Sequence, residues 1–272
     1  MGKFPASGLF EPREVPATKT IKEVLQGGKW SKHVLAATTK PSADDKVDRE
    51  VLERTMDEVA EGKAKGPYTE QEVDAILGTT WAPVRRIGLV QSTGVRPIDD
   101  FSEFGHNASS HTFEHVNLAG IDGVAGIAKT WMDAMATDTA RVTLESGLGK
   151  EGEVHHEFWG AEARGLQGRA IDLRRAFKQL PIAPNMASVA VIVIWHPEVR
   201  APRYFILRAL PFGARNSAYA FGAVARTIER ILSTLFCFLV EQYVDDYPPV
   251  RADSLVRRRL RTSWSCWGGM GS

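Results

Sequence analysis

Three aspartates in the C-terminal half of the 272-residue chain have a sequence setting that suits metal-ion chemistry. Asp172 ends a short apolar segment, while Asp245 and Asp246 lie between Tyr243-Val244 and a Tyr-Pro-Pro turn. We therefore expect all three at strand ends or at the tip of a tight turn. Clustered carboxylates repel one another unless a divalent cation lies between them, and Mg²⁺ binds one or two carboxylates together with substrate phosphates. Two such ions stabilise the attacking and the leaving oxygen of an in-line displacement, so these residues suggest phosphoryl transfer.

Charge is distributed unevenly along the chain. Residues 1–160 carry 18 basic and 25 acidic side chains, whereas residues 161–272 carry 16 basic and 8 acidic ones. A basic half attracts a polyanion through counterion release and long-range steering. Chance clustering or a solvated face accounts for the same numbers equally well. Asp-Asp pairs also occur at 44–45 and 99–100, so the informative feature of the pair at 245–246 is its apolar, basic setting.

The composition excludes several classes of protein. With 43% apolar and 25% charged residues, the chain is typical of a soluble globular protein rather than a disordered or collagen-like one. Its apolar runs are too short or too interrupted to span a bilayer, and two cysteines provide no disulfide framework. A membrane protein and a secreted disulfide scaffold are therefore excluded. His111, His115 and the stretch 155–157 have no cysteine nearby, which favours ordinary loop histidines over a zinc site.

Local patterns predict the elements that position these residues. Apolar spacing predicts helices over residues 44–62 and 216–239, and a third helix is expected over residues 121–135. Thr69 followed by Glu72 is a helix-capping signature. Residues 86–90 and 95–98 predict a hairpin, and the β-branched stretch 187–195 predicts a buried strand with 203–210 as its antiparallel partner. Segregated strands and helices of this kind predict an α+β fold in which helices pack on an antiparallel sheet.

Four segments, taken in order, resemble a known family. They are RPIDDFSEFGHN (96–107), AIDLRRAFKQLPI (170–182), LPFGARNSAYAF (210–221) and QYVDDY (242–247). The first is similar to a fingers motif, and the others are similar to motifs A, B and C of the reverse transcriptase palm. The LPFG-x-x-N wording is most similar to eukaryotic retroelements of the long-terminal-repeat or tyrosine-recombinase type. The resemblance covers residues 81–250, and the order of four motifs makes it far more specific than any one of them.

The resemblance implies a fold and an activity. The fold would be the fingers and palm of a right-hand polymerase, with an antiparallel palm sheet. The activity would be that of a nucleotidyltransferase, an RNA-directed DNA polymerase that adds deoxynucleotides to a primer 3′-hydroxyl with two Mg²⁺ ions, Mn²⁺ being the alternative metal. Its partners would be an RNA or DNA template with its primer and deoxynucleoside triphosphates, with no membrane. A retrotransposon protein of this kind would work in the nucleus or the cytoplasm.

The resemblance also gives roles to individual residues. Asp172 matches the metal ligand of motif A, and Asp245 and Asp246 match the motif C pair, with Asp245 as the direct ligand and Asp246 more peripheral. Arg96 matches the arginine that clamps the incoming triphosphate, a role suited to the fixed fork of a guanidinium. A solvated arginine in an exposed turn is the alternative for Arg96.

Four further residues would contact the nucleotide. Phe177 falls at the position where an aromatic ring excludes a 2′-hydroxyl, and Gly213 would let the backbone approach nucleotide or template. Phe212 and Ser217 would line the same surface. Taken alone, the apolar setting of Phe177 favours a core residue, and Gly213 could simply end a strand before the long helix.

The sequence divides into three regions, and the resemblance covers only the middle one. Residues 1–80 form a polar helical extension, 81–250 the fingers and palm, and 251–272 a basic tail without regular structure. That tail is too short for a thumb, so the chain resembles a polymerase truncated before the thumb, and an inactive fragment that binds nucleic acid without catalysis is the alternative. Motif B has Ala218 where proline is common and Phe212 where some relatives are polar, and no lysine lies between Arg86 and Arg96 for a second triphosphate contact.

Overall fold

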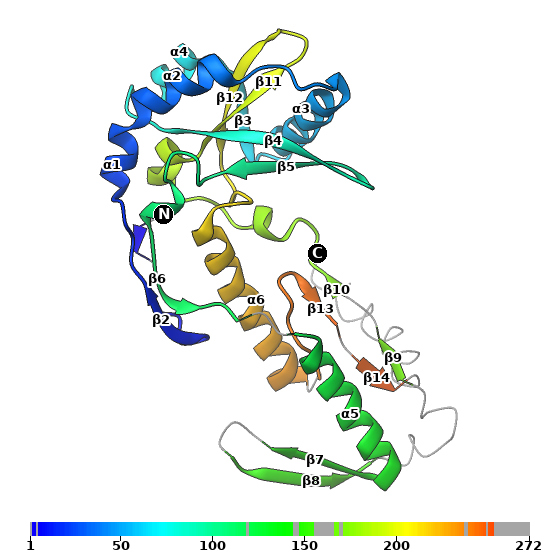
Figure 1. The fold of residues 1–272 in the computed structure, drawn as a ribbon. Helices are drawn as coiled ribbons and strands as arrows, with labels where there is room; N and C mark the ends of the chain where they lie inside the picture. Colours follow the sequence, from blue (N-terminus) through cyan, green and yellow to red (C-terminus); the bar gives the residue numbers. More distant parts are fainter. Residues whose placement is uncertain are drawn as a thin grey trace, which may run out of the picture. The chain divides into compact units, whose positions relative to one another are not determined.

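The computed structural model describes residues 2–3, 5–117, 120–143, 147–154, 166–168, 171–236, 239–248 and 250–252 (Figure 1). It confirms a mixed α+β protein, and the chain divides into two compact units. The first consists of Met1–Val116 with Arg175–Ala223, and the second of Asn117–Arg174 with Val224–Ser272. Residue 80, where the sequence suggests a boundary, lies inside the first unit. No helix within the described ranges is both long and apolar enough to cross a bilayer.

The first unit is built on a five-stranded sheet. Its strands, in spatial order, are β3 (Ala64–Tyr68), β12 (Ala201–Leu207), β11 (Val191–His196), β4 (Pro83–Gln91) and β5 (Gly94–Asp100). The expected pairings of β4 with β5 and of β11 with β12 are confirmed as antiparallel. The sheet as a whole is mixed, because β4 and β11 run parallel. The expected strand at 187–195 begins only at Val191, since Pro184 starts a 3₁₀ segment, η5 (Pro184–Val189), before it.

Helices cover both faces of this sheet. They are α1 (Ile21–Gln26), α2 (Gly28–Thr38), α3 (Asp45–Ala60) and α4 (Glu70–Leu77). Ile192 packs in one core with Val51 of α3, whereas Val193 packs in the other with Leu35 of α2 and Val73 of α4. Successive residues of β11 are thus buried on opposite faces, which explains its unbroken β-branched run.

The helix start at Thr69 confirms the expected cap, and an aspartate caps a second helix. Thr69 Oγ1 accepts a hydrogen bond from the Glu72 amide at 3.3 Å, and Glu72 Oε2 accepts one from the Thr69 amide at 2.7 Å. Asp44 caps α3 by accepting from the Lys46 amide at 2.9 Å. These bonds satisfy amides that the first turn of a helix leaves without partners.

A smaller sheet and two short segments complete the first unit. The sheet has the order β1 (Gly2–Lys3), β6 (Ser110–His115) and β2 (Glu11–Val15). The segments are η1 (Asn107–Ser109) and η4 (Ala176–Gln179). The first residues of α6 (Arg215–Phe236) also belong to this unit. That helix starts one residue before the expected position, and Leu239 lies outside it.

Within the described residues, the second unit contains α5 (Ile121–Thr137), the remainder of α6 and three two-stranded ladders. A helix was expected at the position of α5. The ladders pair β7 (Thr139–Thr143) with β8 (Gly149–Glu153), β9 (Leu166–Gly168) with β14 (Val250–Ala252), and β10 (Ile171–Asp172) with β13 (Asp246–Tyr247). The start of the expected tail, residues 251–252, therefore forms part of a strand, and residues 253–272 lie outside the described part of the chain.

His106 is a buried titratable group in the first unit. Its ring is fully buried and packs edge-on against Phe101, and Nε2 lies 3.2 Å from the carbonyl oxygen of Ala82. Burial lowers the pKa of His106 to about 4, while the hydrogen bond to Ala82 acts in the opposite direction. The folded protein therefore resists a proton that the unfolded chain accepts near pH 6.5.

We expect stability to fall as the pH drops from 6.5 towards 4. A pKa difference of about 2.5 units corresponds to about 3 kcal/mol of unfolding free energy. The His106→Gln variant does not titrate and still offers a donor for the Ala82 carbonyl. Urea unfolding at pH 7 and pH 4.5 should show a smaller loss in this variant than in the wild type. Equal losses in the two proteins would show that His106 is not the titrating group.

Candidate active site

The second unit brings the backbones of the three candidate metal ligands close together. β10 and β13 are antiparallel, and their register makes Asp172 the direct cross-strand partner of Asp246 (Figure 1). The Leu173 amide donates a hydrogen bond of 3.1 Å to the carbonyl oxygen of Asp245. Directly opposed side chains of an antiparallel pair leave the same face with their Cβ atoms about 5 Å apart. Segments more than seventy residues apart in the sequence thus place two carboxylates on one small ladder, and Asp245 lies in the turn beside it.

A tight turn presents Asp245 and Asp246. The amide of Tyr243 donates to the Asp246 carbonyl at 2.8 Å, and the amide of Asp246 donates back to the Tyr243 carbonyl at 2.9 Å. Val244 has a φ of 55°, in the left-handed region that is costly for a β-branched residue. The side chain of Gln242 is fully buried, and its Nε2 donates to the Val244 carbonyl at 2.8 Å. A strained turn is maintained only where its surroundings determine it, and Gln242 contributes to this.

Gln242 was not among the residues expected at the site. The available signal was an amide between the apolar segment 239–240 and the turn, where a polar side chain needs an internal partner. Tyr247, on the other side of the turn, donates from its hydroxyl to the Ala225 carbonyl of α6 at 2.9 Å. Burial, with further contributions from Glu229 and Asp245, raises the pKa of Tyr247 to about 12, so its hydroxyl stays protonated as a donor.

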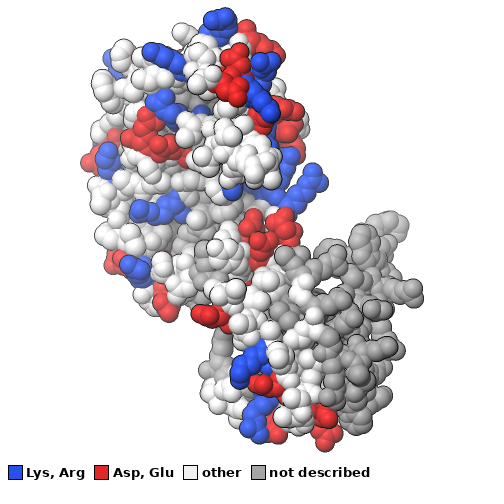
Figure 2. Space-filling model, turned by 45° about the vertical axis from the view of Figure 1, so that its right-hand side comes forward, with Lys and Arg blue, Asp and Glu red and all other residues white. Residues whose placement is uncertain are grey.

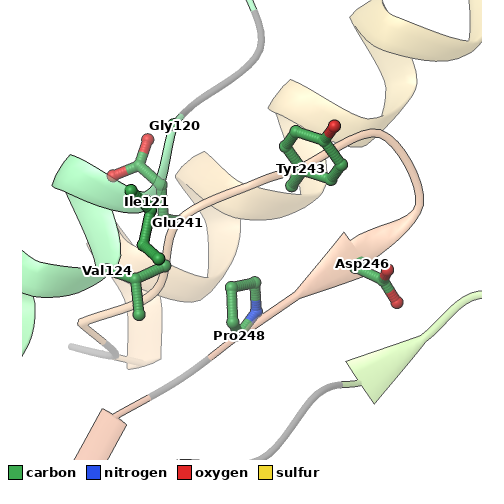
Figure 3. A pocket seen from close by; sticks show the side chains of 7 residues that line it. All are labelled: Gly120, Ile121, Val124, Glu241, Tyr243, Asp246 and Pro248. Carbon is green, nitrogen blue, oxygen red and sulfur yellow. The ribbon is translucent and has the colours of Figure 1, made fainter.

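A cavity of about 240 Å³ lies beside Asp246 (Figure 3). Its lining consists of Gly120, Ile121, Val124, Glu241, Tyr243, Asp246 and Pro248. In Figure 3 the Asp246 carboxylate points away from α5, which provides the apolar side of the cavity. Burial and the nearby Glu229 raise the pKa of Glu241, and Arg226, whose Nη1 is 3.9 Å from Glu241 Oε1, counteracts them. The carboxylates at Asp246 and Glu241 therefore have different surroundings within one cavity.

The aspartates fit Mg²⁺ by donor type and by backbone position. Carboxylate oxygens are the ligands that this ion prefers, and the ladder brings Asp172 opposite Asp246. Among the described residues, however, no three His, Cys, Asp or Glu side chains converge closely enough to hold an ion. Binding would therefore require the carboxylates to rotate towards a shared centre. Of the histidines, His111 is 2.9 Å from Glu14 Oε1, and residues 155–157 lie outside the described chain.

The first unit brings together three of the candidate nucleotide-binding residues. The guanidinium of Arg96 lies 4.3 Å above the ring of Phe212, which is 38% exposed. Phe177 packs edge-on against Phe212, with ring centroids 5.4 Å apart, and contacts the buried Phe221 at 4.8 Å. An exposed cation over an aromatic ring is a surface that can contact both phosphate and base. Phe177 is half-buried and joins this surface to the core.

Gly213 is required by the chain's own packing. Its φ is +102°, and a Cβ atom there would lie 2.3 Å from the carbonyl oxygen of Asp99. Asn107, the last residue of the fingers-like segment, donates to the Gly213 carbonyl at 3.0 Å and accepts from the Arg215 amide at 2.8 Å. Asn107 thereby joins the segments 96–107 and 210–221. The sequence suggests that a side chain at position 213 would collide with a nucleotide or template, whereas in the structure it would collide with Asp99 of β5.

Ser217 does not lie on the surface where the sequence places it. It is 3% exposed within the first turn of α6, and its amide donates to the Ala214 carbonyl at 3.0 Å. The helical phase turns this position towards the interior, while Phe212, before the helix, stays accessible. Of the residues that the family resemblance assigns to nucleotide binding, the described structure therefore brings together Arg96, Phe177 and Phe212, with Gly213 next to Phe212 in the chain.

The described basic residues of the C-terminal half are in part neutralised locally. Lys178 pairs with Glu58 at 3.1 Å, and Arg226 pairs with Glu229 at 2.6 Å. On the face shown in Figure 2, basic and acidic side chains are interspersed over the described atoms. The described part of that face therefore favours solvated, mixed charge over one continuous basic surface.

Comparison with known proteins does not extend these findings. No protein-family model matches the chain, and no curated protein is similar to it in sequence. The candidate site therefore depends on the motifs and on the geometry of this chain itself.

Proposed function

We propose that the chain is a nucleotidyltransferase of the reverse transcriptase type, which adds deoxynucleotides to a primer 3′-hydroxyl on an RNA template. The observation that carries the proposal is the register of β10 with β13, which opposes Asp172 and Asp246 and bonds Leu173 to Asp245. This meeting of the segments that resemble motifs A and C is what the polymerase interpretation requires. Neither segment predicts the other from local sequence.

The electrostatics of the ladder support a bound cation. Like charges that face each other directly across an antiparallel pair destabilise it, yet here two aspartates occupy such positions. When bound, Mg²⁺ would stabilise the negative charge that develops on the reacting oxygens of the phosphate and the primer. Asp172 and Asp245 would hold the ions, and Asp246 would complete the anionic face.

Residues of the first unit would bind the nucleotide. Arg96 offers a planar fork of donors for phosphate oxygens, and its stacking on Phe212 restricts its orientation. Phe177 would exclude a ribose 2′-hydroxyl by steric contact. Positioning and electrostatic stabilisation provide most of the rate of phosphoryl transfer, so few groups with proton-transfer roles are needed.

Primer extension tests the proposal. The full chain is incubated with an RNA template, an annealed DNA primer, four deoxynucleotides and Mg²⁺, and a parallel reaction contains EDTA. We expect template-directed extension of the primer in the reaction with Mg²⁺ and no extension in the reaction with EDTA. If folded protein binds the primer-template but adds no nucleotide with Mg²⁺ or Mn²⁺, the proposal is wrong and the alternative, nucleic-acid binding without catalysis, replaces it.

A further inference from the structure

One carboxylate in the N-terminal segment is linked to both sides of the aromatic group. Glu58, near the end of α3, accepts through Oε2 from both terminal nitrogens of Arg86 at 3.2 Å and from Lys178 Nζ at 3.1 Å. All three side chains are at least 85% buried. Ion pairs this well buried fix geometry, because moving one partner leaves the others uncompensated.

The first link leads to Phe177. Lys178 is the next residue in η4, and Arg175, which precedes η4, pairs with Glu61 at the end of α3. Both ends of the short segment that carries Phe177 are therefore attached to the same end of one helix. The edge-on contact with Phe212 does not by itself fix the position of the Phe177 ring, because such contacts are weakly directional.

The second link leads to Phe212 and Gly213. Arg86 binds the Asp99 carboxylate through two hydrogen bonds, of 2.6 Å from Nε and 3.1 Å from Nη2. The carbonyl of Asp99 packs against Gly213 so closely that a Cβ there has no room. Glu58 thus fixes, through Arg86 and Asp99, the segment that carries Phe212.

The charges of this cluster balance only when Glu58 is present. Arg86 and Lys178 face Glu58 and Asp99, two cations against two anions. Burial and the charge of Arg86 lower the pKa of Lys178, and Glu58 opposes both effects. Removing the carboxylate would leave two buried cations facing one anion, and Lys178 would lose the ion pair that holds the segment carrying Phe177.

We infer that Glu58 is a positioning residue that sets the distance between Phe177 and Phe212 and thereby the preference for deoxynucleotides over ribonucleotides. The inference about selectivity rests on the proposed function, and the inference about positioning does not. It gives the N-terminal segment, which the family resemblance does not cover, a part in the site. Glu58 touches no substrate in this account and acts through Lys178 and Arg86.

The positioning is tested with 4-fluorophenylalanine at residue 177, observed by ¹⁹F NMR. We expect one sharp resonance in the parent protein, which broadens or shifts in Glu58→Gln and in Lys178→Gln. Lys178→Gln leaves the Arg86–Asp99 pair intact and is the safer variant for folding. Glu53→Gln, the same charge change at an exposed position of α3, is the control and should leave the spectrum unchanged. Unchanged spectra in both cluster variants would overturn the inference.

Selectivity is tested by the ratio of kcat/KM for deoxynucleotide to that for ribonucleotide in primer extension. We expect the ratio to fall by roughly tenfold to a hundredfold in Glu58→Gln and Lys178→Gln, as in Phe177→Val. A general loss of stability would lower both activities together and leave the ratio unchanged. If the wild type extends no primer, the proposed function fails while the NMR result still decides the positioning; altered spectra with an unchanged ratio would refute the selectivity.

Discussion

The Asp172→Asn variant is expected to lose Mg²⁺-dependent primer extension by on the order of a thousandfold or more. The substitution keeps the size of the side chain but removes the charge that faces Asp246 across the ladder. Without metal, its melting temperature should equal or exceed that of the wild type, because a like-charge cross-strand pair has been relieved. Loss of activity with retained stability separates a catalytic role from a structural one.

Mg²⁺ itself provides the second half of this measurement. At a free concentration one hundred times the dissociation constant, a bound ion stabilises the wild type by about 2.7 kcal/mol. Asp172→Asn should lose most of the stabilisation by Mg²⁺. The control is Asp133→Asn, because Asp133 forms an exposed ion pair with Lys129 in the same unit. This variant should keep both the stabilisation by Mg²⁺ and the primer extension. Full activity in Asp172→Asn would remove this residue from the site.

The Gly213→Ala variant is expected to lose roughly 3 kcal/mol of unfolding free energy. Part of the loss comes from a φ of +102°, and the larger part from the overlap of the new Cβ with the Asp99 carbonyl. Gly78→Ala separates the two contributions, since Gly78 has a φ of +75° but no atom within 4 Å of its Cβ position. Urea denaturation should show a smaller loss for Gly78→Ala, about 1 to 2 kcal/mol, because a φ of +75° with a ψ of 179° is a conformation that only glycine adopts readily.

Similar losses in the two alanine variants would indicate that backbone strain, and not contact with β5, accounts for Gly213. A large loss in Gly213→Ala alone would confirm that the loop before α6 is seated on Asp99. That outcome would also explain why a glycine is needed there without reference to any ligand.

Local chemistry was enough to predict much of the fold. The capping pair Thr69–Glu72, the hairpin of β4 and β5 and the helix α5 each depend on residues close in sequence, and all are confirmed. The parallel pairing of β4 with β11 was not predicted, because it joins strands separated by about a hundred residues. Nothing in either strand specifies the direction of a distant neighbour.

The candidate site divides in the same way. The order of the motifs led correctly to segments that meet, as the pairing of Asp172 with Asp246 shows. The burial of Ser217 follows from where α6 begins, which sequence determines only to within a few residues. Glu58 and Asn107 were missed because their partners lie far away in the chain, and a lone acid or amide carries no signal of that.

The order of the five-stranded sheet has a consequence for self-association. β3 and β5 form its two edges, and each contains a proline, Pro67 in one and Pro97 in the other. An edge strand offers unpaired backbone groups to any neighbouring chain, and a proline has no N–H to donate. A strand from a second molecule would therefore meet a missing donor at either end of the sheet. Pro97 therefore disfavours edge-to-edge pairing between β5, the strand that carries Arg96, and a strand of another molecule.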